Sequence, residues 1–354
     1  MKIAIFISSL RFGGAEKQAI IDCQLLAKEN KVYLIAFREG ELRHQIPDSV
    51  EFIRLKKRDY FSTAYHLARL LKRLRIEVVH AHLFAPMVIS SMASLLCQAK
   101  VVWNFHSHAY QDADKGRLAH SLASKVPRVK RILFPANELK EYYTGERYTF
   151  PPAKQMIFFN SGQYLERQPF QHIPREVVTV GYVGRIIPLK RVHLLLKLAE
   201  SLKEKDVRNV HISIVGDGNS MPELKAAAKQ KGVAEMVTFH GFQSNTRQHY
   251  ERFDLFALPS EEEVLSLSLI DAQLSGLPAV AFDVGGNKDI IEHGRSGFIV
   301  QQEQEFIERL QELLLDEVLR IRMGQRAIEQ STDKFSQQAR ADNLQNLYKT
   351  VLHS

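Results

Sequence analysis

Short apolar runs alternate with amphipathic stretches along most of the 354-residue chain. In the first half, runs rich in β-branched residues predict strands, and stretches with apolar residues three or four positions apart predict helices. Strands are expected at 2–7, 31–36, 78–81 and 100–105, and helices at 15–29, 60–74 and 85–97. This alternation is typical of a parallel, doubly wound sheet.

The same pattern starts again after a stretch without periodicity. Residues 148–175 are rich in Pro, Gln and Phe, and we expect a linker at 164–175. Beyond it, strands are expected at 177–183, 211–215, 237–239, 255–258 and 279–282, and helices at 192–203, 222–231, 265–275 and 303–317. The predicted fold class is α/β, with two Rossmann-like doubly wound domains facing across a cleft. They are expected at 1–163 and 176–330, with a helix at 331–354 that returns to the N-terminal domain.

Three loops that follow predicted strands carry the residues suited to chemistry, because open α/β sheets bind ligands beyond the carboxyl ends of their strands. The first loop holds Gly13 and Gly14 before the first helix. Paired glycines let backbone N–H groups approach a ligand, and the start of a helix favours an anion. A tight turn without a ligand explains this loop equally well.

The second loop, residues 184–190, follows the first strand of the second domain. It places Arg185 and Lys190 where two cations can grip a diphosphate. It lacks the GK[ST] ending of a P-loop, so the pattern does not indicate nucleotide hydrolysis.

The third loop, residues 259–272, runs from a strand into a helix. Glu263 and Asp271 lie where carboxylates can accept hydrogen bonds from sugar or ribose hydroxyls. Alternatively, the acidic cluster at 261–263 only complements the helix dipole. The two acids stand eight residues apart, about 12 Å along a helix, which is too far for the carboxylate pair of a glycosidase.

Together these loops resemble the GT-B glycosyltransferases of family 4. That family typically has a Gly-Gly-Ala-Glu opening, a Gly-Arg-x-x-x-x-Lys diphosphate loop and two acids separated by seven residues. Residues 13–16, 184–190 and the pair Glu263 and Asp271 match these motifs. Further matching segments follow in order at 79–82, 103–107, 159–162, 215–218, 240–242, 276–278, 284–286 and 292–297.

The resemblance implies where the nucleotide sugar binds. Gly13 and Gly14 are expected to face the donor diphosphate, and Arg185 and Lys190 are expected to grip it. UDP is the expected nucleotide. No metal and no cofactor besides this donor substrate are expected.

The resemblance also assigns the sugar-binding residues. Glu263 is expected to hold hydroxyls of the donor sugar, Asp271 to contact the ribose, and His106 to lie close to the transferred sugar. Backbone amides of the third loop are expected to support sugar and phosphate, at Leu265, Ser266 and Leu267. Val264 stands where the family has glycine, so a glycine-style turn is expected to be reshaped there.

Histidines gather at the ends of two predicted strands of the first domain. His106 follows the strand at 100–105 and is expected at the ligand-binding edge. His80 and His82 point to the same face if their strand continues, and we expect at least one of them to be structural. A metal site from these histidines is chemically possible, but the resemblance implies a reaction without metal.

The net charge of +8 is unevenly distributed. Residues 1–150 carry 24 Lys and Arg against 14 Asp and Glu, a net charge of +10, and the remainder carries −2. This asymmetry indicates an anionic partner for the first domain, and we expect an anionic membrane surface or a lipid-linked acceptor. Solvated helix faces explain any single basic cluster equally well. Nucleic acid is not expected, because the basic runs lack interleaved aromatic residues.

Composition and cysteine usage suggest the compartment. Cys23 and Cys97 lie far apart and form no CxxC pair, which fits a reducing cytoplasm. The apolar start of the chain is expected to be a buried strand, not a signal peptide, and the longest uncharged stretch, 83–99, is too short and polar to span a bilayer. We expect a cytoplasmic enzyme, peripheral at the inner face of the plasma membrane.

The resemblance implies a retaining hexosyl- or N-acetylhexosaminyltransferase. It is expected to move a sugar from a UDP-sugar to a lipid-linked or polysaccharide acceptor in cell-surface glycan assembly. A sugar-nucleotide epimerase of similar architecture is one alternative. A non-catalytic GT-B partner subunit is the other, because Val264 and Asp271 depart from the family pattern.

Overall fold

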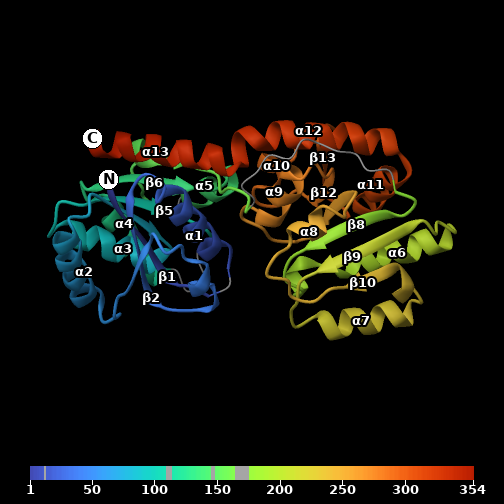
Figure 1. The fold of residues 1–354 in the computed structure, drawn as a ribbon, viewed down its shortest axis with the longest axis horizontal. Helices are drawn as coiled ribbons and strands as arrows, with labels where there is room; N and C mark the ends of the chain where they lie inside the picture. Colours follow the sequence, from blue (N-terminus) through green and yellow to red (C-terminus); the bar gives the residue numbers. More distant parts are fainter. Residues whose placement is uncertain (12, 109–113, 145–147, 164–174) are drawn as a thin grey trace. The chain divides into compact units, whose positions relative to one another are not determined.

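The computed structural model describes the chain except residues 12, 109–113, 145–147 and 164–174 (Figure 1). The described residues form two compact units, Met1–Ser161 with Gln337–Ser354 and Gly162–Ser336. The first stretch of the first unit thus ends at Ser161, where the sequence had suggested 163. The chain returns to this unit at Gln337, where the sequence had suggested 331. The linker expected at 164–175 lies outside the described residues, apart from Arg175.

The first unit is built on seven parallel strands in the order β3-β2-β1-β4-β5-β6-β7. The strands are β1 (Lys2–Ser9), β2 (Lys31–Arg38), β3 (Glu51–Arg54), β4 (Val78–His82), β5 (Lys100–Asn104), β6 (Val129–Phe134) and β7 (Gln155–Ile157). The strand order reverses between β1 and β4. In Rossmann-like sheets this switch point, at the carboxyl ends of the strands, is where ligands bind.

Helices cover the sheet of the first unit (Figure 1). They are α1 (Gly14–Leu26), α2 (Tyr60–Leu74), α3 (Phe84–Ser94), α4 (Asp114–Ser124), α5 (Asn137–Thr144) and α13 (Gln337–His353), with short 3₁₀ turns η1 (Glu41–Gln45) and η2 (Pro152–Lys154). Helix α3 packs against α2 and α4, and α1 packs against α13. Helix α2 begins where the Asp59 carboxylate accepts a hydrogen bond from the Ser62 amide, and it ends at the left-handed residue Arg75.

The second unit repeats the plan with six parallel strands in the order β10-β9-β8-β11-β12-β13. The strands are β8 (Val178–Val183), β9 (Val210–Val215), β10 (Val237–Phe239), β11 (Leu255–Leu258), β12 (Ala279–Phe282) and β13 (Gly297–Val300). The helices are α6 (His193–Glu204), α7 (Met221–Gln230), α8 (Arg247–Tyr250), α9 (Leu267–Leu274), α10 (Asn287–Ile290), α11 (Glu303–Leu315) and α12 (Glu317–Phe335), with 3₁₀ turns η3 (Pro188–Lys190) and η4 (Ala234–Met236). Its switch point lies between β8 and β11.

The central strands are apolar because both of their faces are covered. Residues Ile3 to Ile7 of β1 have no exposed surface, and the residues of β11 and β12 are all buried. The predicted central strands are therefore present. Four edge or short strands, β3, β6, β7 and β13, were not predicted; β6 contains Lys130 and Arg131, which interrupt its apolar pattern.

A buried ion pair joins the two ends of the chain inside the first unit. Arg340 of α13 donates two hydrogen bonds to the Asp22 carboxylate of α1, at 2.9 and 2.8 Å, and a third to the Phe159 carbonyl at 2.6 Å. The Arg340 and Asp22 side chains are 1% and 0% exposed. A buried pair tolerates loss of one partner poorly, because the other charge then stays in the interior uncompensated.

We therefore predict that Arg340→Met lowers the free energy of unfolding by about 3–5 kcal/mol. The double variant Asp22→Leu/Arg340→Met should recover part of this loss, since it leaves no lone charge. Urea unfolding followed by circular dichroism measures both. Lys349→Met, exposed on the same helix, is the matched control and should change stability by less than about 0.5 kcal/mol. Equal stability of Arg340→Met and the control would contradict the prediction.

Candidate active site

Two loops at the switch point of the second unit bring a cation and a carboxylate together. Lys190 lies in the turn η3 after β8, and Glu263 lies in the loop after β11. The Lys190 Nζ stands 2.6 Å from the Glu263 Oε1 and donates to the Glu262 carbonyl at 3.2 Å. The Lys190 and Glu263 side chains are only 14% and 13% exposed. Solvent therefore screens this pair less than it would an ion pair on the open surface.

The loop that carries Lys190 packs closely against the loop after β9, at Gly216. Gly216 has a φ of 135°, and a Cβ at this position would stand 1.8 Å from the Gly184 carbonyl oxygen. Only glycine therefore lets the loop after β9 pass so close to the loop after β8.

A second glycine contact holds the loop that carries Glu263. Gly285 has a φ of 55°, and a Cβ there would stand 2.1 Å from the Glu263 carbonyl oxygen. The amide of Gly286 donates to the Val264 carbonyl at 2.7 Å. Val264 itself is not among the residues with positive φ. The left-handed backbone in this region belongs to Gly285, so valine fits at 264 without strain.

Helix α9 begins immediately after this loop. The Ser266 Oγ accepts a hydrogen bond from the Leu269 amide at 3.3 Å and caps the helix. The backbone N–H groups of three residues at the start of α9 donate to no acceptor in the part of the chain that the structure describes. They are those of Leu265, Ser266 and Leu267. Free amides at a helix start attract anions. The structure thus places these three predicted residues next to Glu263.

Asp271 has a different environment from the one expected. Its side chain is fully buried in α9. Its Oδ1 accepts a hydrogen bond from the Gln163 amide at 2.7 Å, and its Oδ2 accepts one from the Gln163 Nε2 at 3.0 Å. Asp271 therefore secures the start of the second unit, and a ribose would have to displace Gln163 to reach it.

Arg185 lies in the loop after β8 with an exposed side chain. Its carbonyl accepts a hydrogen bond from the Tyr182 hydroxyl at 2.8 Å, which ties the loop to the strand. Burial, together with the nearby Glu263 carboxylate, raises the pKa of Tyr182 well above its usual range, so this hydroxyl stays a donor at neutral pH. The Arg185 guanidinium forms no ion pair with any carboxylate of the described residues.

In the first unit, the predicted glycine turn does start a helix at the carboxyl edge of the sheet. Gly13 is the N-cap of α1, and Gly14 is its first residue. A Cβ at Gly13 would stand 2.3 Å from the Glu16 Oε2, so the Glu16 carboxylate lies over the turn. Burial raises the pKa of Glu16. A diphosphate contact at this turn would require Glu16 to move or to be protonated.

Two histidines of β4, His80 and His82, and His106, which follows β5, lie together at the carboxyl edge of the first sheet. The His82 Nδ1 lies 2.8 Å from the His106 Nε2, and the two rings stack with centroids 5.0 Å apart. The His80 Nδ1 lies 2.7 Å from the Tyr348 hydroxyl of α13. His80 and His82 are fully buried, whereas His106 is half-buried. Burial lowers the pKa of all three, so the rings are neutral at pH 7 and His82 fixes the orientation of His106.

The backbone is strained directly after His82. Leu83 has φ 70° and ψ 164°, a region that is essentially reserved for glycine. Such strain costs about 1–3 kcal/mol and persists where the surrounding structure holds it, often at functional sites. Here it lies at the carboxyl end of β4, where the sheet topology places the ligand-binding edge.

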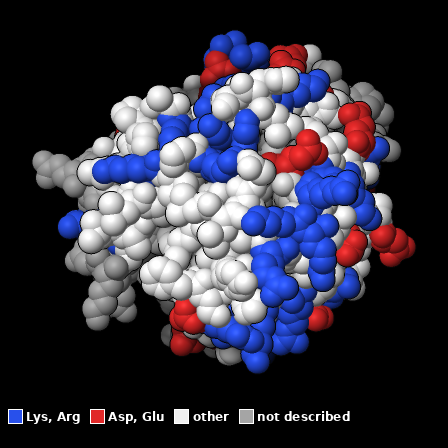
Figure 2. Space-filling view, turned by 90° about the vertical axis from the view of Figure 1, so that its left-hand side faces the viewer, with Lys and Arg blue, Asp and Glu red and all other residues white. Residues whose placement is uncertain are grey.

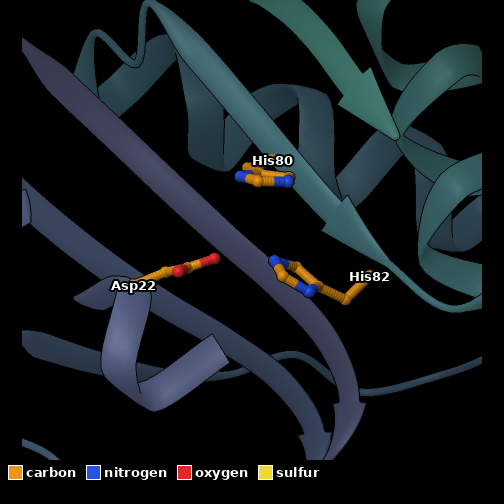
Figure 3. A group of neighbouring side chains, drawn as sticks. All are labelled: Asp22, His80 and His82. Carbon is orange, nitrogen blue, oxygen red and sulfur yellow. The ribbon is translucent and has the colours of Figure 1, made fainter. Parts of the chain in front are cut away.

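Asp22, His80 and His82 are the described residues that could share a metal ion (Figure 3). Their ligand atoms lie within 4.8 Å of one another, and Figure 3 shows the Asp22 carboxylate directed towards the two rings. Both Asp22 oxygens, however, accept hydrogen bonds from Arg340. A divalent cation would therefore stand beside a buried guanidinium and compete with it for one carboxylate. The arrangement favours the ion pair over a metal.

Sequence reasoning missed the residues that α13 contributes to this cluster, Arg340 and Tyr348. A charged residue on the buried side of an amphipathic helix is the only sequence signal for Arg340, and its partner Asp22 is 318 positions away. It also missed Gln18, whose Nε2 donates to the Asp22 Oδ1 at 2.9 Å and whose Oε1 accepts from the Ser161 amide at 3.0 Å.

No helix among the described residues is long and apolar enough to cross a membrane.

Comparisons with known proteins agree with this architecture. Residues 12–161 match the family described as Glycosyltransferase Family 4, and residues 166–330 match Glycosyl transferases group 1. Relatives include an uncharacterized glycosyltransferase of Haemophilus influenzae, 25% identical over 94% of this chain and 96% of its own. Another is the Escherichia coli UDP-Gal:alpha-D-GlcNAc-diphosphoundecaprenol alpha-1,3-galactosyltransferase, 24% identical over 95% of this chain and 93% of its own.

The fold also matches a solved structure along its whole length. The crystal structure of HepE from Anabaena in complex with UDP has a TM-score of 0.83 at 18% identity, over 99% of this chain and 100% of that one. The predicted fold class, two Rossmann-like units, is confirmed. Taken together, the two family matches and the repeated Rossmann order show that the chain belongs to the GT-B glycosyltransferases of family 4, glycosyl transferases group 1.

Proposed function

We propose that this enzyme transfers a sugar, with retention of anomeric configuration, from a UDP-sugar to a lipid-linked or polysaccharide acceptor in glycan assembly. The observation that carries the proposal is the Lys190–Glu263 pair beside the free amides that precede α9. A cation and amides suit a diphosphate, and a carboxylate suits sugar hydroxyls. The Escherichia coli relative is named for UDP-Gal and for a GlcNAc-diphosphoundecaprenol acceptor, which supports this substrate class.

The chemical step is departure of UDP from the anomeric carbon. The bond between that carbon and the phosphate oxygen breaks with its electron pair on the oxygen, so negative charge grows on the diphosphate. The same carbon forms a bond to an acceptor hydroxyl oxygen, and the proton of that hydroxyl passes to the departing diphosphate. Arg185, Lys190 and the amides at 265–267 would stabilise this charge most strongly in the transition state. The Lys190 ammonium has three donors and can bind a phosphate oxygen while it keeps Glu263 in place. We propose no metal or further cofactor for this step.

The family resemblance implies that Asp271 contacts the ribose, and we propose a structural role for it instead. Since its oxygens are bonded to Gln163, we assign it to positioning the start of the second unit. Gly13 and Gly14 keep their proposed place near the donor, with Glu16 as the group that must yield to the diphosphate.

We predict that Lys190→Ala and Arg185→Ala each weaken UDP binding by about 1.5–3 kcal/mol, the range for a charge-assisted hydrogen bond. Isothermal titration calorimetry with UDP measures this. Lys197→Ala is the matched control, because Lys197 is a cation of the same unit whose partner is Glu303. Full-strength UDP binding by Lys190→Ala would remove Lys190 from the donor site.

His106 is proposed to contact the transferred sugar. It follows β5 at the carboxyl edge of the sheet, its ring is held by His82, and its half-buried side chain retains access to solvent. Because the ring is neutral, it can donate or accept one hydrogen bond without bringing a charge to the sugar.

We predict that His106→Ala lowers single-turnover transfer at least tenfold, about 1.4 kcal/mol, while UDP affinity and melting temperature change little. The assay follows sugar transfer from a UDP-sugar to an isoprenyl diphosphate-linked monosaccharide, and proton NMR of the product reports the anomer. His120→Ala is the control: His120 is buried and bonded to the Gly116 and Phe84 carbonyls, so its loss should lower the melting temperature instead. Near-normal transfer by an unstable His106→Ala would show that His106 is structural. An inverted anomer would refute retention.

We also propose that the first unit docks on an anionic membrane through the outer side of α2. Lys and Arg gather in a broad band on this side of the unit, with few acidic residues among them (Figure 2). Helix α2 exposes a stripe at four-residue spacing: Phe61, Tyr65, Arg69 and Arg73. Phe61 and Tyr65 are 79% and 52% exposed. Aromatic rings followed by cations on one helix face suit the interface of an anionic bilayer.

The docking proposal predicts binding to phosphatidylglycerol vesicles that weakens as salt rises, since such charges act within about 8 Å at physiological salt. Arg69→Ala/Arg73→Ala should lose about 2 kcal/mol, at about 1 kcal/mol per cation. Vesicle sedimentation measures the partition. Lys197→Ala/Lys231→Ala changes the net charge equally at two paired cations of the second unit and should bind normally. Equal partition onto neutral phosphatidylcholine vesicles would refute the proposal.

A further inference from the structure

A hollow of about 640 Å³ lies at the carboxyl edge of the first sheet, beyond the ends of β2 and β3. Its lining is cationic apart from one ring: Phe37, Arg38, Arg54, Lys56, Lys57 and Arg58. Arg38 is the last residue of β2 and Arg54 is the last residue of β3, and these strands are parallel neighbours. Arg38 and Arg54 therefore lie at the same edge of the sheet. The segment after β3 adds three more cations, Lys56, Lys57 and Arg58.

These five cations have no carboxylate partner within the described ranges of the chain. All five side chains are exposed. Two acids adjoin these cations in sequence, Glu39 and Asp59. Asp59 is used elsewhere, because its Oδ1 accepts a hydrogen bond from the Ser62 amide at 2.9 Å and caps α2. Glu39 forms no ion pair with the described residues. The Lys57 ammonium lies 5.6 Å from the centroid of the Phe37 ring. Packing alone gives no reason to gather five like charges.

Several surface cations of the second unit have a carboxylate partner. Lys197 pairs with Glu303, Lys231 with Glu200, and Arg309 with Glu312, at 2.7 Å in each case. The cations of the hollow have no such partners among the residues that the structure describes. A hollow lined by charges of one sign concentrates the electrostatic potential and attracts a ligand of the opposite charge.

The surroundings of the hollow indicate which anion it takes. A Cβ at Gly40 would stand 2.5 Å from the Leu10 carbonyl oxygen, so the segment after β2 packs directly on the loop after β1. The hollow therefore adjoins the ligand-binding edge of the unit. Along the chain, Arg58 is followed after two residues by Phe61, which is exposed together with Tyr65 on the first turns of α2. A phosphate-bearing group with an apolar chain fits both the cations and the rings.

We propose that this hollow binds the diphosphate of a lipid-linked acceptor, with the guanidinium groups of Arg38 and Arg54 at the sheet edge and Lys56, Lys57 and Arg58 around them. The inference rests on the proposed function, because it supplies the acceptor side of that reaction. Arginine binds phosphate oxygens in a bidentate manner, and the lysines add mobile point charges.

The test is calorimetry of the full chain, saturated with UDP so that the donor site is filled, with farnesyl diphosphate as the probe. Arg54→Ala/Lys56→Ala/Lys57→Ala should bind farnesyl diphosphate at least tenfold more weakly than the unchanged protein. Lys197→Ala/Lys203→Ala/Lys231→Ala removes the same charge from surface positions of the second unit that do not line the hollow, and it should change the affinity less than about threefold. Equal affinity in the unchanged protein and the first variant, or equal loss in both variants, would overturn the site.

Two further binding experiments distinguish a lipid-linked diphosphate from free pyrophosphate and from bilayer headgroups. Inorganic pyrophosphate should bind the same hollow more weakly than farnesyl diphosphate, and Phe61→Ser should remove that difference. Pyrophosphate bound as tightly as farnesyl diphosphate would overturn the lipid-linked assignment. Phosphatidylglycerol vesicles should not compete with farnesyl diphosphate for the hollow; full competition would assign it to bilayer headgroups.

The UDP titration of the first variant separates this inference from the proposed function. Normal UDP binding with unchanged farnesyl diphosphate binding would refute the hollow alone. Absence of UDP binding in the unchanged protein would refute the donor proposal and leave the farnesyl diphosphate comparison valid.

Discussion

The ion pair between Arg340 and Asp22 is the interaction on which the first unit depends. It fixes α13 against α1 in an interior where an unpaired charge would be severely destabilising. Once α13 is in place, Tyr348 reaches His80, and the neighbouring His82 holds His106. A helix at the far end of the chain thus contacts the first of three neighbouring histidine rings, the last of which lies at the ligand-binding edge. The same pair occupies the carboxylate that a metal ion would need.

The second unit reaches its geometry by steric means. Loops from β8, β9, β11 and β12 approach so closely that glycine is required at Gly216 and Gly285, where a side chain would strike a carbonyl oxygen. This crowding holds Lys190 against Glu263 and places both near the free amides before α9. A preformed arrangement of this kind needs little reorganisation when charge develops on a departing diphosphate.

The two units differ in how their surface cations are paired. The second unit neutralises many of its surface cations with neighbouring carboxylates. The first unit keeps an unpaired group around Arg38 and Arg54, and it exposes aromatic rings and cations along α2. This difference supports the proposal that the second unit binds the nucleotide sugar and the first unit an acceptor at a bilayer.

The sequence by itself determined the alternating strands and helices, the doubled Rossmann plan and the loops that carry Lys190, Glu263 and His106, because periodicity and loop position are local properties. Only the tertiary structure decided what those residues touch. The Asp271 carboxylate accepts hydrogen bonds from Gln163, a partner that the motif spacing does not give, and Val264 needs no positive φ because the left-handed residue is Gly285. Arg340 and Asp22 meet across 318 positions, a contact set by helix packing that no local pattern encodes.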